Sequence, residues 1–455
     1  MAKDAQGLPS NETFGYVWGR AVGFSTGCSK RMNEEGDHVG RYVNTAVVVE
    51  DMVGIVEALG EWREKKGQAE AKQLSVSQRV AALDRTKWKK GREKILYWGF
   101  SYGTILGATL ASMHPDRLER IAMDGVADAE DYYKGYWLTN LQDTDLIIDK
   151  FHEDCYTAGP NKCALWNPLG SEHSQLVFDR VLKRLQTSPL PVSASGSHGP
   201  ELITYSDLML LIRSALYTPR FWFPLLARVF ADLDLGNGTE FAAFKQNQLR
   251  GFCRSPICNK NPWNSDCHDP LQSAMESGRA IMCSDAPDHT NWTEEDHFKK
   301  YLTLMEQSKY LGASWSEITM YCANWNVRPA WPYTPSLEGN TSIPILWITN
   351  TRDPVTPLRN AIKMSKAFPG SVVLKQEADG HCSLAAPSLC TALHIRKYFQ
   401  EGKLPPKDVT CIPDWGTFNG EESDLRSLIK EERELSDALK ELSRGFGTDG
   451  PLGFL

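Results

Sequence analysis

The pentapeptide Gly99-Phe100-Ser101-Tyr102-Gly103 is the part of the sequence best suited to chemistry. The apolar run from Ile95 to Trp98 before it predicts a buried strand, and the stretch from Thr104 to Met113 after it predicts a helix. A G-x-S-x-G sequence in this context is typical of a nucleophile elbow, whose sharp turn exposes the serine hydroxyl. The free N–H groups at the start of the helix favour negative charge on a carbonyl oxygen under attack. The sequence therefore predicts that Ser101 is a nucleophile.

A serine hydroxyl needs a base, and the base needs an orienting carboxylate. Behind an elbow of this kind the chain order is serine, acid, histidine. Asp353 stands in a turn after a predicted strand, Ile343 to Thr349, and His381 follows the next predicted strand, Val372 to Gln376. Because the carboxyl ends of parallel strands meet at one edge of a sheet, we predict that Asp353 orients His381 and that His381 is the base.

Structural roles remain as alternatives for both residues. Asp353 could form a turn or cap the helix that follows it, and His381 could be an exposed loop residue. The other histidines considered are expected on helices or in an insertion rather than on a loop at the sheet edge, and they are His114, His289, His297 and His394.

A metal site was considered for four residues that lie within 16 positions of one another, Cys253, Cys258, Cys267 and His268. Their spacing lacks the paired two-residue gap of familiar structural zinc sites, which favours disulfides or simple burial. No G-x-x-x-x-G-K-[ST] occurs, and no G-x-G-x-x-G follows a predicted strand. We therefore expect no metal site here and no nucleotide cofactor.

The elements that position these residues predict an α/β fold whose parallel sheet is interrupted and then resumes. Strand Ile121 to Met123 is expected to end its first part. The 455 residues divide into 1–128, the first part of the core with the elbow; 129–340, a largely helical insertion; 341–412, the second part of the core with the acid and the histidine; and 413–455, a charged helical tail.

Two helices outside the site can be predicted from their periodicity. One begins after Asn44 and is expected to end at Gly60, ahead of a polar connection over 61–93. The other lies in the tail, where Leu428, Leu435, Leu439 and Leu442 share helical spacing. This tail helix is either solvated or loosely docked, or it is a helix that binds a partner.

Composition and charge exclude several classes of protein. The formal net charge is −7, hydrophobic residues make up 41% and charged residues 24%, and no strongly basic stretch suggests nucleic acid as a partner. The sequence contains no run of about 18 apolar residues, so it predicts no membrane-spanning helix.

Eleven cysteines and the sequons at Asn11, Asn237, Asn291 and Asn340 favour an exported glycoprotein with disulfides, although the first residues lack the apolar core of a secretory signal. The cellular location and the oligomeric state stay open.

Taken together, the motifs resemble the tripeptidyl-aminopeptidase-like branch of the α/β-hydrolases, from about residue 14 to 412. The segments that carry the resemblance are Gly99 to Thr104, Thr351-Arg352-Asp353-Pro354-Val355-Thr356-Pro357, Gly380-His381, and Cys390 through Leu404-Pro405 to Cys411. Further matches are Asp124-Gly125-Val126, Ala280 to Asp285, and Cys322 to Trp325.

The resemblance implies an α/β-hydrolase fold, with a mostly parallel sheet, helices on both faces and a large, mainly helical inserted cap. Members of this branch are mostly exported serine hydrolases that release short peptides or single residues from free N-termini and need no cofactor. By resemblance, Ser101 is the nucleophile, Asp353 the acid and His381 the base, while the backbone N–H of Tyr102 is one oxyanion donor. The resemblance also suggests a Cys390–Cys411 disulfide.

One family feature is missing from the sequence. Family members carry early strands and a Gly-rich loop that supplies a second oxyanion N–H, and no such loop occurs between Met1 and Gly99. Loss of one such donor costs about 3 kcal/mol of transition-state stabilisation, and loss of the strands exposes a sheet edge. We expect either a truncated version of a longer exported enzyme or a diverged and weaker protein.

Three functions follow from these observations. The leading hypothesis is a serine peptidase that acts on free N-termini; the second is an esterase or thioesterase that acts on a small metabolite; the third is a catalytically silent relative used for binding. Recognition of a free amino terminus needs a carboxylate in the insertion to pair with the substrate ammonium. Asp285, Glu294 and Glu295 are available there, and the sequence offers no basis for choosing among them.

Overall fold

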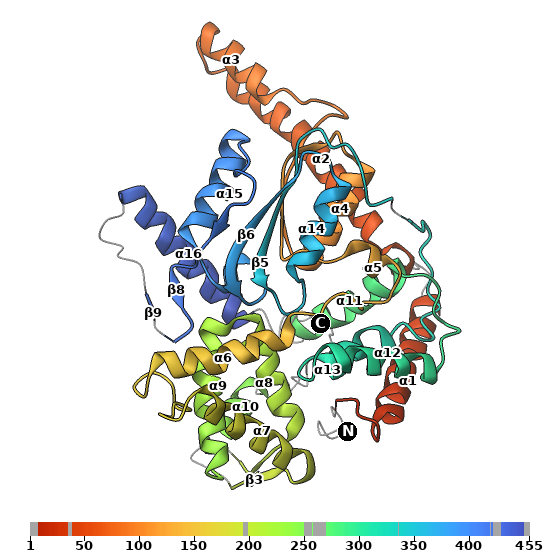
Figure 1. Ribbon diagram of the computed structural model, residues 1–455. Coiled ribbons are helices and arrows are strands. Elements are labelled where there is room, and N and C mark those ends of the chain that lie inside the picture. Colours follow the sequence, from red (N-terminus) through yellow and green to blue (C-terminus); the bar gives the residue numbers. More distant parts are fainter. Residues whose placement is uncertain are drawn as a thin grey trace.

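A five-stranded parallel sheet lies at the centre of the molecule (Figure 1). The computed structural model describes residues 8–34, 39–193, 199–249, 257, 270–334, 336–418, 420–421 and 429–449. The strand order is β1-β2-β5-β6-β7, and every pairing in this sheet is parallel. The strands are β1 (Ile95–Phe100), β2 (Leu118–Asp124), β5 (Leu346–Arg352), β6 (Val372–Asp379) and β7 (Thr410–Cys411).

Helices cover both faces of the sheet because successive residues of a strand point to opposite sides. In β2, Ile121 and Met123 pack towards helices α2, α4 and α14, whereas Ala122 between them packs towards α15. The helices are α2 (Thr45–Ala71), α4 (Tyr102–Met113), α14 (Leu358–Ala367) and α15 (Leu389–Glu401). The predicted mostly parallel sheet with helices on both faces is therefore confirmed.

The chain leaves the sheet after β2 and returns at β5, and the residues between form a mainly helical cap below the carboxyl ends of the strands (Figure 1). Its helices are α5 (Ala129–Tyr133), α6 (Thr144–Ala158), α7 (Ser171–Thr187), α8 (Tyr205–Tyr217), α9 (Pro219–Asp234), α10 (Thr239–Leu249), α11 (Pro270–Asp285), α12 (Glu294–Gln307) and α13 (Gly312–Met320). A short hairpin, β3 (Leu190–Val192) with β4 (Glu201–Ile203), is also part of it. The cysteines and the histidine of the considered metal site, Cys253, Cys258, Cys267 and His268, lie outside the described residues.

Three disulfides join described cysteines. Cys155–Cys163 and Cys283–Cys322 lie within the cap, and Cys390–Cys411 ties α15 to β7. The last pairing is the one that the family resemblance suggested, and it is confirmed.

The prediction that the helix after Asn44 ends at Gly60 is wrong. Helix α2 continues to Ala71, and α3 (Val76–Thr86) occupies much of the expected polar connection. Gly60 is buried, and a Cβ atom there would lie 2.7 Å from both Trp88 and Glu93. Glycine thus allows close packing at this position instead of ending the helix, because tertiary contacts override its low helix propensity.

The first helix packs on the cap rather than on the sheet. Helix α1 (Phe14–Glu34) contacts α12 and α13, and the rings of Phe14 and Phe298 lie 5.0 Å apart edge to face. The hydroxyl of Ser25 donates to the carbonyl oxygen of Tyr321 at 2.5 Å. Segments almost 300 positions apart in the chain therefore form one helical layer.

The last helix, α16 (Lys430–Asp449), docks on α15 and on the short η6 turn (Ser383–Ala385). Leu439 is 7% exposed and packs near Leu384, whose carbonyl oxygen accepts a hydrogen bond of 2.8 Å from the Ser443 hydroxyl. Leu428, part of the predicted tail pattern, lies outside the described residues. None of the helices in the described ranges is long and apolar enough to span a membrane.

Candidate active site

Ser101 forms the sharp turn between β1 and α4. Its φ of 54° and ψ of −120° place a non-glycine residue in a strained region of the backbone. Its N–H donates to the carbonyl oxygen of Asp124 at 3.0 Å, which ties the turn to the end of β2. A Cβ atom on Gly99 would lie 2.6 Å from the carbonyl oxygen of Gly103, so the backbone before and after the serine passes too closely for a larger residue. The turn therefore has the geometry that the G-x-S-x-G sequence predicts.

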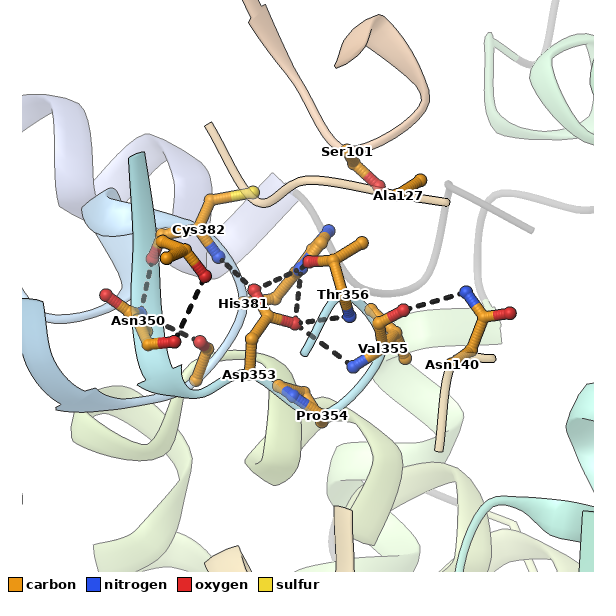
Figure 2. Close-up of polar contacts among 12 residues, drawn as sticks. Ser101, Ala127, Asn140, Asn350, Asp353, Pro354, Val355, Thr356, His381 and Cys382 are labelled. Atoms are coloured by element: carbon orange, nitrogen blue, oxygen red, sulfur yellow. Dashed lines mark hydrogen bonds and ion pairs between the residues drawn. The ribbon is translucent and has the colours of Figure 1, made fainter. Parts of the chain in front are cut away.

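Asp353 and His381 come together at the same edge of the sheet, as Figure 2 shows. Both carboxylate oxygens of Asp353 lie 3.0 Å from Nδ1 of His381. Asp353 is fully buried and also accepts the backbone N–H groups of Val355, Thr356 and Cys382, at 3.0, 2.8 and 2.9 Å. The carboxylate thus meets enough donors to remain in the interior and to fix the orientation of the imidazole.

No hydrogen bond joins Ser101 to His381 in the described part of the chain, and the buried Nε2 atom of His381 has no partner there. With the Nδ1 proton directed at Asp353, Nε2 carries the free lone pair that a general base needs. Hydrogen bonds between nucleophile and base are often long until substrate binds. The structure therefore brings the predicted acid and base together after β5 and β6, and it places the predicted nucleophile at the end of β1, which β2 separates from β5.

Asn350 and Gln376 hold the loop of His381, and sequence reasoning missed both. The side-chain amide of Asn350 donates to the carbonyl oxygens of Gly380 and Cys382, each at 2.8 Å. Gln376 donates to the side-chain oxygen of Asn350 at 3.0 Å and to two further carbonyl oxygens of the loop. Buried amides late in two neighbouring strands were the available signal in the sequence.

A second buried carboxylate, Asp124, lies behind the histidine loop. It accepts the backbone N–H of Ser383 at 2.8 Å and the Ser383 hydroxyl at 2.5 Å. Burial raises the pKa of Asp124 to about 6, although these hydrogen bonds oppose the shift. The neighbouring thiol of Cys382 is buried and lies 3.5 Å from the carbonyl oxygen of Asp124. Burial raises the pKa of that thiol, and the backbone N–H of Ser101 partly offsets the shift. Since that N–H also donates to the carbonyl oxygen of Asp124, the histidine loop and the elbow meet at this oxygen.

The cap contacts the histidine through the corner between α8 and α9. The ring of Tyr217 meets the imidazole of His381 edge to face, with ring centres 5.0 Å apart. The carbonyl oxygen of Tyr217 also accepts a hydrogen bond of 2.8 Å from the backbone N–H of His381. Near the acid, the amide of Asn140 donates to the carbonyl oxygen of Val355 at 2.8 Å. Cap residues therefore help to hold both the acid and the base loops.

Asp285 holds the residue that follows the nucleophile. Its carboxylate accepts the N–H of Thr45 at 2.9 Å and the Tyr132 hydroxyl at 2.8 Å, and it also accepts the Thr45 hydroxyl. The Thr45 hydroxyl in turn hydrogen-bonds to the hydroxyl of Tyr102. Burial raises the pKa of Asp285 to about 6. The side chain of Tyr102 is thereby anchored to helices α2 and α11. The backbone N–H of the same residue is the predicted oxyanion donor.

Potential metal ligands gather at two places among the described residues. Asp353, His381 and Cys382 form one group, but the first two already hydrogen-bond to each other. The second group contains His394 with Cys390 and Cys411, whose sulfurs form a disulfide and are not free thiolates. Neither group offers a prepared set of metal ligands.

Comparison with known proteins agrees with this geometry. The family described as TAP-like protein matches residues 308–411, a segment that contains both Asp353 and His381. A tripeptidyl aminopeptidase from Streptomyces lividans is 25% identical over 336 residues, which are 73% of this chain and 57% of the relative. Serine protease Hip1 from Mycobacterium tuberculosis is 23% identical over 72% of this chain and 60% of its own length.

A more distant match is Carboxylesterase B from Mycobacterium tuberculosis, which is 22% identical over 54% of this chain and 44% of its own length. The chain spans somewhat more than half the length of the two peptidases that it matches. The parallel sheet and the elbow turn at Ser101 agree with an α/β-hydrolase fold, and the matched segment and the relatives make the chain similar to the TAP-like branch of that fold.

Proposed function

We propose that this protein is a serine peptidase that releases short peptides or single residues from free N-termini. The observation that carries the proposal is the strained Ser101 turn beside a buried Asp353–His381 pair, in the chain order of an α/β-hydrolase. The similarity to a tripeptidyl aminopeptidase and to serine protease Hip1 supports peptides as the substrate class.

In the proposed mechanism, Oγ of Ser101 attacks the scissile carbonyl carbon while Nε2 of His381 accepts the hydroxyl proton. Asp353 stabilises the imidazolium through Nδ1, and the N–H of Tyr102 donates to the oxyanion. The tetrahedral intermediate collapses when His381 returns the proton to the leaving amine, which leaves an acyl group on Ser101. Water, activated by the same histidine, then hydrolyses the acyl-enzyme and regenerates the free serine.

A fluorophosphonate probe tests this proposal directly because it labels a serine only when that serine is activated. We expect an adduct on Ser101 and hydrolysis of tripeptidyl anilides. Both should be absent in Ser101→Ala and reduced at least ~10³-fold in His381→Ala. Ser112→Ala is the matched control, since Ser112 lies near the end of α4 away from the elbow and its hydroxyl donates to the carbonyl oxygen of Ala108, and it should behave as wild type. A folded wild-type protein without adduct or turnover would overturn the proposal and favour a silent relative.

An esterase is the second candidate, and the similarity to Carboxylesterase B favours it. The same serine, acid and histidine chemistry cleaves esters and amides. A panel that contains short acyl esters, acyl thioesters and unblocked peptidyl anilides separates the two functions. Ester or thioester hydrolysis without any peptide cleavage would favour the esterase.

A further inference from the structure

Two histidines outside the active site are buried in the cap and have ring nitrogens without hydrogen-bond partners. His297, on the first turn of α12, is 1% exposed, and neither of its ring nitrogens has a partner among the described residues. His289 lies in the loop before this helix and is 6% exposed, and its Nδ1 has no partner there either. Buried polar atoms without partners are rare in folded proteins, so these three nitrogens need an explanation.

Aromatic rings connect the two imidazoles to each other and to neighbouring helices. The ring of Trp292 stacks on His289 with ring centres 4.1 Å apart, and it meets His297 edge to face at 5.3 Å. From α1, the ring of Trp18 lies 4.9 Å from that of His297. A Cβ atom on Gly135, just after α5, would overlap Cε1 of His289. The two histidines therefore lie where α1, α12 and the end of α5 pack together.

Positive charges lie close to this cluster. Lys300, one turn further along α12, is buried, and its Nζ donates to the Thr319 hydroxyl of α13 at 2.5 Å. The charge of Lys300 disfavours a proton on either histidine, and Arg328 acts in the same direction on His289. The charge of Asp131 on α5 favours the protonated form of Lys300. The cluster thus contains a lysine that competes with the imidazoles for positive charge.

Carboxylates near the histidines compensate only in part. Asp288 and Asp296 each favour a proton on one of the two imidazoles, but both carboxylates are exposed to water, which weakens their effect. On the helices that pack against α12, Arg20 of α1 and Glu317 of α13 pair with each other at 3.8 Å. The surroundings therefore oppose a positive charge on either ring.

These surroundings give the protonation of the histidines a direction. Burial, together with nearby positive charge, lowers the pKa of His289 to about 4 and that of His297 to about 3. Burial also lowers the pKa of Lys300 to about 7, so this lysine is charged below that pH. Opening of the cluster to water returns the imidazoles to the ordinary pKa of about 6.5. Between about pH 6.5 and 4 the open form therefore binds more protons than the closed form, and acid favours opening.

We propose that His289 and His297 form an acid-sensitive latch, which holds α12 against α1 and the end of α5 while both imidazoles are neutral. Protonation of both rings adds two positive charges beside Lys300 in a buried aromatic cluster. The segment from His289 to the first turns of α12 then separates from α5. Histidines suit such a switch because their charge changes in this pH range when their surroundings change.

Helix α5 connects the latch to the nucleophile elbow. Tyr132 on this helix donates to Asp285, and its ring centre lies 5.8 Å from that of Tyr102, the residue after Ser101. Opening of the latch removes packing from the end of α5, so the support of Tyr102 weakens in acid. The inference concerns regulation of the site and does not depend on which ester or amide the protein cleaves.

Hydrogen exchange of the full chain, followed by mass spectrometry from pH 7 to pH 5, measures the opening of α12 after correction for the pH dependence of chemical exchange. We expect the opening equilibrium to grow ~50-fold between pH 6 and 5, since both imidazoles take up protons on opening. His297→Phe keeps a ring against Trp18 and Trp292 but cannot be protonated, and it should reduce this growth to ~7-fold. Peptides from β5 should stay protected, because the latch opens only one part of the cap.

His152→Phe is the matched control. His152 on α6 is also buried in the cap, and burial lowers its pKa to about 4, but it contacts Phe151, Phe178 and Ser174 instead of the latch. This variant should keep the wild-type pH dependence of exchange in α12. Equal pH dependence in wild type and His297→Phe, or loss of protection in β5 together with α12, would overturn the latch. If His297→Phe does not fold, wild type decides alone, and growth of only ~7-fold or less between pH 6 and 5 overturns it.

Discussion

Asp353 shows how hydrogen bonds make a buried carboxylate tolerable. A charged carboxylate removed from water costs several kcal/mol unless donors replace the lost hydration. Asp353 has no exposed surface, and it receives three backbone N–H groups as well as Nδ1 of His381. Because two of these donors belong to its own turn and the others to the histidine loop, one side chain fixes both loops of the site.

Asp124 should make the stability of the protein depend on pH. Its pKa is raised to about 6 in the folded protein, above the ordinary value of about 3.9 that applies to the unfolded chain. Between these values the folded state binds more protons than the unfolded state, so the free energy of unfolding decreases as the pH rises from about 4 to 6. Asp124→Asn should weaken this decrease without abolishing it, since Asp285 has a similarly raised pKa.

Urea unfolding at pH 4, 5, 6 and 7 measures this effect in Asp124→Asn and in wild type. Asp116→Asn is the control, because Asp116 is exposed on the loop before β2. If Asp124→Asn and wild type show the same change in free energy of unfolding across this range, the pKa assignment for Asp124 is wrong.

The corner between α8 and α9 is the element that positions the histidine loop from the cap side. Gly380 has a φ of +111°, and a Cβ atom there would lie 2.7 Å from Cδ of Pro219 and 2.9 Å from the carbonyl oxygen of Tyr217. The cap and the loop that carries His381 therefore pack together with no room for one additional methyl group. Movement of either segment changes the position of the imidazole.

We expect Gly380→Ala to displace the histidine loop and to slow fluorophosphonate labelling of Ser101 by at least ~10-fold, since small misplacements of catalytic groups are costly. Gly236→Ala is the matched control because Gly236 also has positive φ, +78°, but nothing lies within 4 Å of its added Cβ. The control should lose only ~1–2 kcal/mol of stability for the strained backbone and keep its labelling rate. Equal labelling rates in the two variants would show that the close packing at Gly380 does not position His381.

The site was predictable only where its signals are local. The elbow around Ser101 combines strand, turn and helix within a short window, and the order of acid and histidine follows the order of the strands. Asn350 acts on a loop 30 residues away, and Tyr217 contacts His381 from a different part of the fold. Such contacts depend on packing rather than on spacing: an amide late in a predicted strand is a weak signal for Asn350, and no pattern in the sequence indicates the contact of Tyr217. The prediction at Gly60 was wrong for the opposite reason. Glycine is a local signal for the end of a helix, but close packing against Trp88 and Glu93 keeps Gly60 inside α2.

At the scale of the whole molecule, the cap lies below the carboxyl ends of the strands, and helix α1 packs on the part of the cap that contains α12 and α13 (Figure 1). Helix α1 joins α12 and α13 through an aromatic cluster, and Cys283–Cys322 fastens α11 close to the end of α13. The part of the cap around α12 and α13 is therefore assembled from the insertion and from the start of the chain.

Strand β1 is the outermost strand of the described sheet, and this position has a consequence for amide hydrogen exchange. The N–H groups of Ile95 and Ser101 point to β2, and the alternation of a strand directs those of Tyr97 and Gly99 the same way. The N–H groups of Leu96 and Trp98 point away from the sheet. Hydrogen exchange measured by NMR should therefore alternate between slow and fast amides along β1. The central strand β5 should not show this alternation, because it has a paired neighbour on each side.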